Sequence, residues 1–142
     1  MRAASFLFIM VLALACNNGA ADKKAEATDV VAVPGAITNI TWLDSTKNVG
    51  KIAEGEKVEI AFRFVNSGDK PLVIQSVSVS CGCTVAEKPG ELFAPGKEGV
   101  IKAIFDSKGR VGANHKTVTV YANTEQPMHP LSFDVEVVPA NK

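Results

Sequence analysis

The sequence predicts an all-β domain of two packed sheets that fills most of the chain. Three observations support this fold class. Short segments of alternating apolar and polar residues recur from about residue 37 onward, turn residues separate them, and no segment has the period of a helix. At 142 residues and 46% hydrophobic composition, the chain is long enough for one ordinary domain with its own core.

The strands are predicted from period-two alternation, because successive side chains of a strand point to opposite faces. In the segment VEIAFRF, for example, Val58, Ile60 and Phe62 share one face while Glu59 and Arg63 occupy the other. Six segments show a comparable pattern, and about seven strands are expected in all: NITWLD at 39–44, VEIAFRF at 58–64, LVIQSVSVS at 72–80, GVIKAIFD at 99–106, KTVTVYAN at 116–123 and LSFDVEV at 131–137.

Turns are predicted at NSGDKP, APGKEG and SKGRVG, which lie between these strands. In the first turn, between the residues Asn66 and Pro71, we expect Gly68 at positive φ and Pro71 to limit the first hydrogen bond of the next strand. In the second turn, Pro95 presets φ and Gly96 supplies the positive φ of a type II turn. All five residues are assigned a structural role in the turns.

Regularly spaced short strands over about a hundred residues are typical of an immunoglobulin-like β-sandwich. We expect this domain to cover residues 37–139. No internal repeat is evident in the sequence.

The first 15 residues are expected to be a signal peptide. Arg2 is followed by the apolar run AASFLFIMVLALA, which is too short to span a bilayer. The run ends in LALAC, which resembles a bacterial lipobox, so Cys16 is expected to be lipidated and to begin the mature chain. An ordinary signal peptide cleaved after Ala15, leaving a free cysteine, is the alternative.

Residues 16–36 are expected to form the lipidated cysteine and a disordered tether. This segment is small, polar and alanine-rich, and it has no sustained apolar period. About twenty residues reach at most roughly 65–70 Å when extended. That length suits a domain held away from a membrane by a lipid anchor.

The domain resembles the bacterial family known as domain of unknown function 1573. The resemblance runs from about residue 40 to 138 and rests on NSGDKPL at 66–72, SCGCT at 80–84, Pro95 with Gly96, Gly112 and Asn123. The family is similar in turn to immunoglobulin-like modules of the ASPM, SPD-2 and Hydin type and to major sperm protein domains. The resemblance implies an adaptor fold and a lipoprotein setting, and it implies no established activity.

Composition and motifs argue against two classes of function. Lysine plus arginine equals aspartate plus glutamate at 15 each, so no overall positive field favours nucleic acid. The sequence has no phosphate-binding glycine loop and no His-Glu-x-x-His motif. His115 and His129, the only histidines, flank turns and are expected to be solvated side chains. We therefore predict a protein that is not an enzyme and needs no cofactor.

Cys81 and Cys83 are the most distinctive pair in the domain. In period two they continue the apolar row of Val77 and Val79, so we expect them to be buried thiols with a structural role. A disulfide competes, but alternate residues of an extended strand have Cα atoms about 6.5–7 Å apart, near the upper limit for a bridge. Gly82 could permit a kink that brings them closer.

Two further interpretations of the cysteine pair stay open. Joined by His129 or Met128, the thiols could bind Cu(I) as soft ligands, although metal sites more often space their thiols by two to four residues. A thiol-redox role would need an exposed thiol with a lowered pKa.

These observations predict a lipid-anchored binding or adaptor module of the bacterial cell envelope, facing the periplasm or the cell surface. Its expected partner is another envelope protein or a polysaccharide, in addition to the membrane that holds the anchor. The alternative is a periplasmic copper-binding or thiol-redox protein that uses the Cys-Gly-Cys pair.

Overall fold

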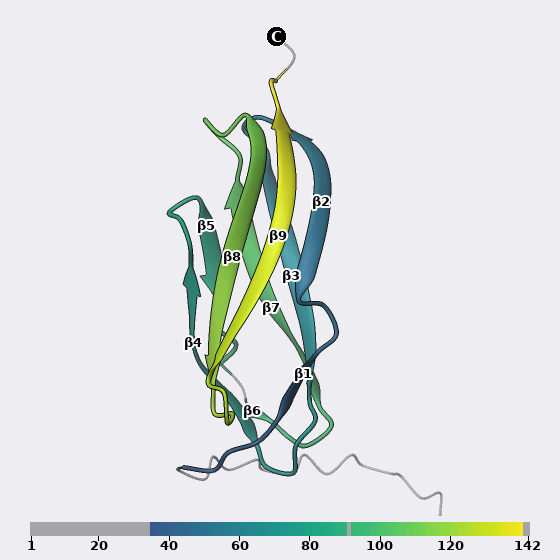
Figure 1. The fold of residues 1–142 in the computed structure, drawn as a ribbon, viewed down its shortest axis with the longest axis vertical. Helices are drawn as coiled ribbons and strands as arrows, with labels where there is room; N and C mark the ends of the chain where they lie inside the picture. The colour runs from purple at the N-terminus through teal and green to yellow at the C-terminus, as the bar shows by residue number, and fades with distance from the viewer. Residues whose placement is uncertain (1–34, 91, 141–142) are drawn as a thin grey trace, which may run out of the picture.

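The computed structural model describes residues 35–90 and 92–140. They form two β-sheets packed face to face into an elongated sandwich (Figure 1), which confirms the predicted fold class. The strands in the described part of the chain are β1 (Ile40–Trp42), β2 (Thr46–Ala53), β3 (Lys57–Asn66), β4 (Leu72–Val79), β5 (Thr84–Glu87), β6 (Leu92–Phe93), β7 (Glu98–Asp106), β8 (Gly112–Ala122) and β9 (Met128–Val138).

The two sheets differ in size and in how their strands run. One sheet has four strands in the order β1-β3-β7-β5, and the other has five in the order β2-β9-β8-β4-β6. β2 pairs with β9 in parallel, whereas the other paired strands are antiparallel. The chain therefore changes sheets between β1 and β2, which ties the two layers together near the start of the domain.

The core lies between the sheets and is formed by the faces that the alternation pattern predicts. Aromatic rings dominate it: Phe64 packs edge-on against Phe93 with ring centroids 4.9 Å apart, and Phe105 packs against Phe133 at 5.7 Å. All four side chains are at most 1% exposed. Burying one side chain of this kind contributes about 1.5–3 kcal/mol, so the four rings together contribute about 6–12 kcal/mol of gross apolar burial.

Three strands were not predicted as separate elements. β5 and β6 are only four and two residues long, and β2 departs from alternation because its register with β9 shifts between Asn48 and Gly50. Gly50 adopts a φ of 82°. Glycine is common at such a positive φ in β-bulges, where one strand carries an extra residue. The extra residue is Val49, which packs toward the core.

The turn at Pro95 and Gly96 has the predicted form. Gly96 has a φ of 77°, and the Lys97 amide donates a hydrogen bond of 2.9 Å to the carbonyl oxygen of Ala94. This bond closes the four-residue turn that a Pro-Gly pair favours.

Candidate functional site

The turn between β3 and β4 is organised by one buried side chain, Asn66. Its Nδ2 donates to the carbonyl oxygens of Lys70 at 2.7 Å and Phe93 at 2.8 Å. Its Oδ1 accepts from the Gly68 amide at 3.1 Å and from the Thr38 hydroxyl at 3.0 Å. Every hydrogen-bonding position of the amide group is therefore used inside the fold, and none is left for a ligand.

Gly68 is required for a reason other than the predicted positive φ, which it does not have. A Cβ at this position would collide with Oγ1 of Thr38 and would lie 2.5 Å from the backbone nitrogen of Asn39. The prediction of a left-handed glycine was therefore wrong. Glycine is needed here because the segment preceding β1 crosses the turn in close contact.

Asn123 makes a second set of side-chain hydrogen bonds near this turn, to the start of β4 and to the segment before β1. Its Oδ1 accepts from the Val73 amide at 2.7 Å, and its Nδ2 donates to the carbonyl oxygens of Ala36 at 2.9 Å and Pro71 at 3.0 Å. Pro71 directly precedes β4, which begins at Leu72. The side-chain hydrogen bonds of both asparagines therefore connect segments that are far apart in the sequence.

The structure places Cys81 and Cys83 in a turn and joins them by a disulfide. This differs from our expectation of two free thiols that continue the strand. β4 ends at Val79, and the Thr84 amide donates to the Cys81 carbonyl oxygen at 3.3 Å, so the chain turns at Gly82. The turn brings the two Cα atoms to 5.2 Å, within the range for a bridge.

The two sulfurs of this disulfide have different surroundings. Cys83 is 5% exposed and belongs to the core, whereas Cys81 is partly exposed at its margin. The Thr84 hydroxyl lies 3.7 Å from the Cys81 sulfur and 3.8 Å from the Cys83 sulfur. Closing a loop of three residues contributes on the order of 1.5 kcal/mol by chain entropy, against about 4.7 kcal/mol for a loop of 100. The disulfide is therefore a minor contributor to stability.

The register of the five-stranded sheet separates the cysteines from the other proposed copper ligands. His129 pairs with Val120, which pairs with Val77. Val79, the last residue of β4, is already about 7 Å beyond Val77 along the strand, and Cys81 follows it in the turn. Within residues 35–90 and 92–140, no group of three or more His, Cys, Asp or Glu side chains is arranged to hold a metal. The geometry does not support the copper interpretation.

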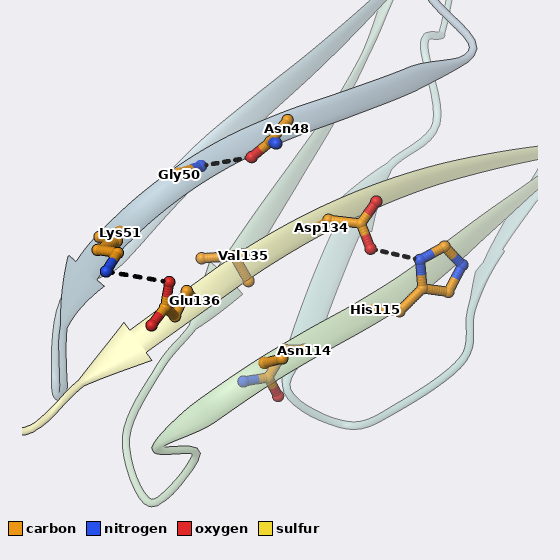
Figure 2. A pocket seen from close by; sticks show the side chains of 9 residues that line it. Asn48, Gly50, Lys51, Asn114, His115, Asp134, Val135 and Glu136 are labelled. Atoms are coloured by element: carbon orange, nitrogen blue, oxygen red, sulfur yellow. Dashed lines mark hydrogen bonds and ion pairs between the residues drawn. The ribbon is translucent and has the colours of Figure 1, made fainter.

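A shallow groove lies on the outer face of the five-stranded sheet, over β2, β9 and β8 (Figure 2). It has a volume of about 450 Å³. Two rows of paired residues cross it, one formed by Asn48, Asp134 and His115 and the other by Lys51, Glu136 and Ala113. Sequence reasoning missed this site because its residues meet only through strand pairing.

The bulge in β2 shapes the groove. Asn48 accepts a hydrogen bond of 2.9 Å from the Gly50 amide, which holds the side chain against its own strand. Gly50 and Ala113 contribute little or no side chain, and this leaves the space open. The bulge between Asn48 and Gly50 interrupts the alternation of β2, which is why the strand was not predicted. The same bulge helps to form the groove.

Charged side chains of both signs border the groove. Nδ1 of His115 lies 2.7 Å from a carboxylate oxygen of Asp134, and the Lys51 ammonium lies 3.4 Å from Glu136. Figure 2 shows both pairs turned toward each other across the strands. All four side chains are at least half exposed, and exposed ion pairs contribute only about 0–1 kcal/mol. A polar ligand could therefore replace these contacts at little cost.

His129 is partly buried rather than solvated. Its Nε2 lies 2.8 Å from the Thr124 hydroxyl oxygen, and its ring centroid is 6.1 Å from that of Trp42. Burial lowers the pKa of this imidazole below its usual value, because the charged form would lose hydration. His129 is therefore biased toward the neutral form.

Cys16, the signal peptide and most of the predicted tether lie outside the described residues. In residues 35–90 and 92–140, no helix combines the length and apolarity needed to cross a membrane.

The two packed sheets define an immunoglobulin-like β-sandwich. The family described as Protein of unknown function (DUF1573) matches residues 40–137. The chain belongs to this family, as its sequence motifs indicated. A comparison with curated proteins finds no match.

Solved structures share the fold at low sequence identity. A protein of unknown function from Porphyromonas gingivalis W83 has a TM-score of 0.62 and 14% identity; the match covers 77% of this chain and 51% of that one. The PapD-like domain 7 of human CEP192 has a TM-score of 0.59 and 13% identity, covering 78% and 92% of the two chains. The VesB protease of Vibrio cholerae has a TM-score of 0.54 and 13% identity, covering 69% and 31%.

These similarities establish the fold alone. The chain spans about half the length of the Porphyromonas structure and about a third of the protease, so neither whole protein is represented here. The CEP192 domain is matched over 92% of its length, so the shared fold covers that whole sandwich.

Proposed function

We propose that this protein is a lipid-anchored binding module of the bacterial cell envelope, with no catalytic role of its own. The observation that carries the proposal is the groove over β2, β9 and β8. It is open and bordered by carboxylate, imidazole, ammonium and amide groups that are only weakly engaged with one another. Such a surface can exchange its internal contacts for contacts with a polar partner.

The two asparagines of the turns are excluded as binding residues, and this leaves the groove as the better candidate. Asn66 and Asn123 use their side-chain amides within the domain and are not available to a partner. The polar groups of the groove are the better candidates for recognition, because they lie on a rigid sheet.

The anchor and tether complete the proposed arrangement. Lipidated Cys16 would hold the chain at a membrane facing the periplasm or the cell surface, and residues 16–36 would let the domain reach a partner up to roughly 65–70 Å away. We propose that the partner is another envelope protein, because a groove with charges of both signs matches the mixed charges of a protein surface.

Site-specific photocrosslinking in the intact envelope tests the proposal. A photoreactive amino acid at Asn48, in the groove, is expected to yield a discrete crosslinked protein. A matched probe at Val100, which is 39% exposed on the other sheet, should not yield it.

Two results would count against the proposal. Identical products from both positions would show that the groove is not selective, and a product that resists protease but contains sugar would identify a polysaccharide partner instead. The double substitution Lys51→Ala and Asp134→Ala should reduce the Asn48 crosslink several-fold, since it removes one member of each exposed pair, Lys51–Glu136 and Asp134–His115.

A further inference from the structure

The Cys81–Cys83 disulfide is a second chemically distinctive feature, and it lies in the turn between β4 and β5 rather than at the groove. It links residues that are already neighbours in the chain. Because it closes only a three-residue loop, its stabilising effect is small compared with that of a bridge between distant segments.

One of the two cysteines lies at the margin of the core, where the residue is partly exposed. Cys81 is partly exposed, and Gly82 is exposed with no atom within 4 Å of the position that a Cβ would occupy. β5 follows directly and is the outermost strand of its sheet, so no strand of the described residues pairs with it beyond β7. Val85 on this strand is 65% exposed. The turn is therefore open to another protein chain.

The other sulfur is held in place inside the fold. Cys83 is 5% exposed, and its carbonyl oxygen accepts a hydrogen bond of 2.9 Å from the Asp106 amide of β7. The Thr84 hydroxyl is within hydrogen-bonding distance of both sulfurs. It can donate to whichever sulfur carries negative charge when the disulfide opens.

We propose that this pair performs thiol–disulfide exchange with a dithiol protein, and that Cys81 is the sulfur attacked. A thiolate of the partner attacks Sγ of Cys81. A new S–S bond forms between them, the Cys81–Cys83 bond breaks, and its electron pair leaves on Sγ of Cys83, which takes a proton from water.

A second thiolate of the partner then attacks the partner's own sulfur in the mixed disulfide. It releases Cys81, which is protonated to a thiol. The partner has been oxidised by two electrons to a disulfide, and the Cys81–Cys83 pair has been reduced to two thiols. Exchange with a more oxidising disulfide restores the pair by the reverse steps. The inference does not depend on the groove or on its partner.

Single-cysteine variants test which sulfur reacts. In the full chain carrying Cys16→Ser, the variant Cys83→Ser leaves Cys81, and the variant Cys81→Ser leaves Cys83. With oxidised glutathione as the probe, Cys81 is expected to form a mixed disulfide at least about tenfold faster than Cys83, because thiol reactivity follows access. Equal rates, or a faster Cys83, would overturn the assignment.

A second test uses the intact Cys81–Cys83 pair. Its result does not depend on whether the single-cysteine variants fold. In the full chain carrying only Cys16→Ser, the oxidised pair is expected to convert a reduced two-cysteine peptide to its disulfide, with one pair reduced per peptide oxidised. Mass spectrometry measures both products. If the pair reacts only at denaturant concentrations that unfold the domain, the disulfide is purely structural and the proposal fails.

Discussion

Asn66 shows how much a single buried amide can hold together. Its four side-chain hydrogen bonds join the strand end of β3 to Thr38, to its own turn and to the carbonyl oxygen of Phe93. Two of these partners belong to segments 27 or 28 residues away in the chain. No aliphatic side chain of similar size could replace these bonds.

Replacing Asn66 by alanine should therefore be costly. Asn66→Ala removes four side-chain hydrogen bonds at a buried site, each contributing about 0.5–1.5 kcal/mol, so we expect a loss of about 3–5 kcal/mol in the free energy of unfolding. Urea denaturation followed by circular dichroism measures it. The control is Asn39→Ala, at an exposed position, which should change stability by less than about 0.5 kcal/mol. Equal effects for the two variants would contradict this account.

His129 makes stability depend on pH. Burial lowers its pKa in the folded state, so the unfolded chain binds the proton more readily. The contribution of neutral His129 to the free energy of unfolding is fully present above the pKa of about 6.5 in the unfolded chain. It is lost as the pH falls through the lower pKa of the folded state. We expect the melting temperature to fall between about pH 7 and pH 5. His129→Gln should flatten this part of the profile, because glutamine does not titrate in this range.

At the scale of elements, the turn between β3 and β4 is defined by the segment that crosses it. Thr38 donates its hydroxyl to the Lys70 carbonyl oxygen at 2.9 Å as well as to Asn66, and its backbone forms a bridge with Thr124. The turn, the start of β1 and the end of β8 therefore form one packed unit.

Gly68 offers a direct test of this packing. Gly68→Ala places a methyl group against Thr38 and Asn39, and we expect a loss of about 1–3 kcal/mol, as for other overpacked sites. Gly90→Ala is the control, because Gly90 has open space around it and no positive φ. Thermal unfolding of both variants measures the difference. A neutral Gly68→Ala would mean that the segment before β1 moves aside without cost.

The long strands were predictable because their alternation is strict. The segment from Val58 to Phe64, for example, buries Ile60, Phe62 and Phe64, and nothing in it competes with that pattern. The Pro95–Gly96 turn was predictable for a similar reason, since both residues restrict or permit φ locally. Local rules were sufficient wherever the local sequence determined the conformation.

The candidate sites were less predictable because they depend on distant neighbours. The cysteine pair was found by its motif, but its turn was not, since period two continued smoothly from Val79 to Cys83. The groove residues Lys51, His115 and Asp134 come together only through the pairing of β2, β9 and β8. In particular, no single-sequence signal reveals the register between β2 and β9, in which Lys51 pairs with Glu136, 85 residues away.

At the scale of the whole molecule, the proposed anchor determines where the domain acts. If Cys16 is lipidated, the mature chain should sediment with membranes and carry the mass of the acyl groups. Cys16→Ser should move it to the soluble fraction or leave it unprocessed, because the polar tether offers no other apolar attachment. Intact mass spectrometry of the fractionated protein decides the matter. A soluble mature chain with an unmodified Cys16 would contradict the prediction.

The parallel pairing of β2 with β9 also has a mechanical consequence. Seven residues of β2 have partners on β9, and both strands run along the long axis of the sandwich (Figure 1). A pull on the segment before β1, opposed by a load at the other end of the sandwich, would act along these strands. The backbone hydrogen bonds between them would then share the load in shear instead of opening one at a time. Tension applied in this direction would therefore be shared by the whole β2–β9 ladder.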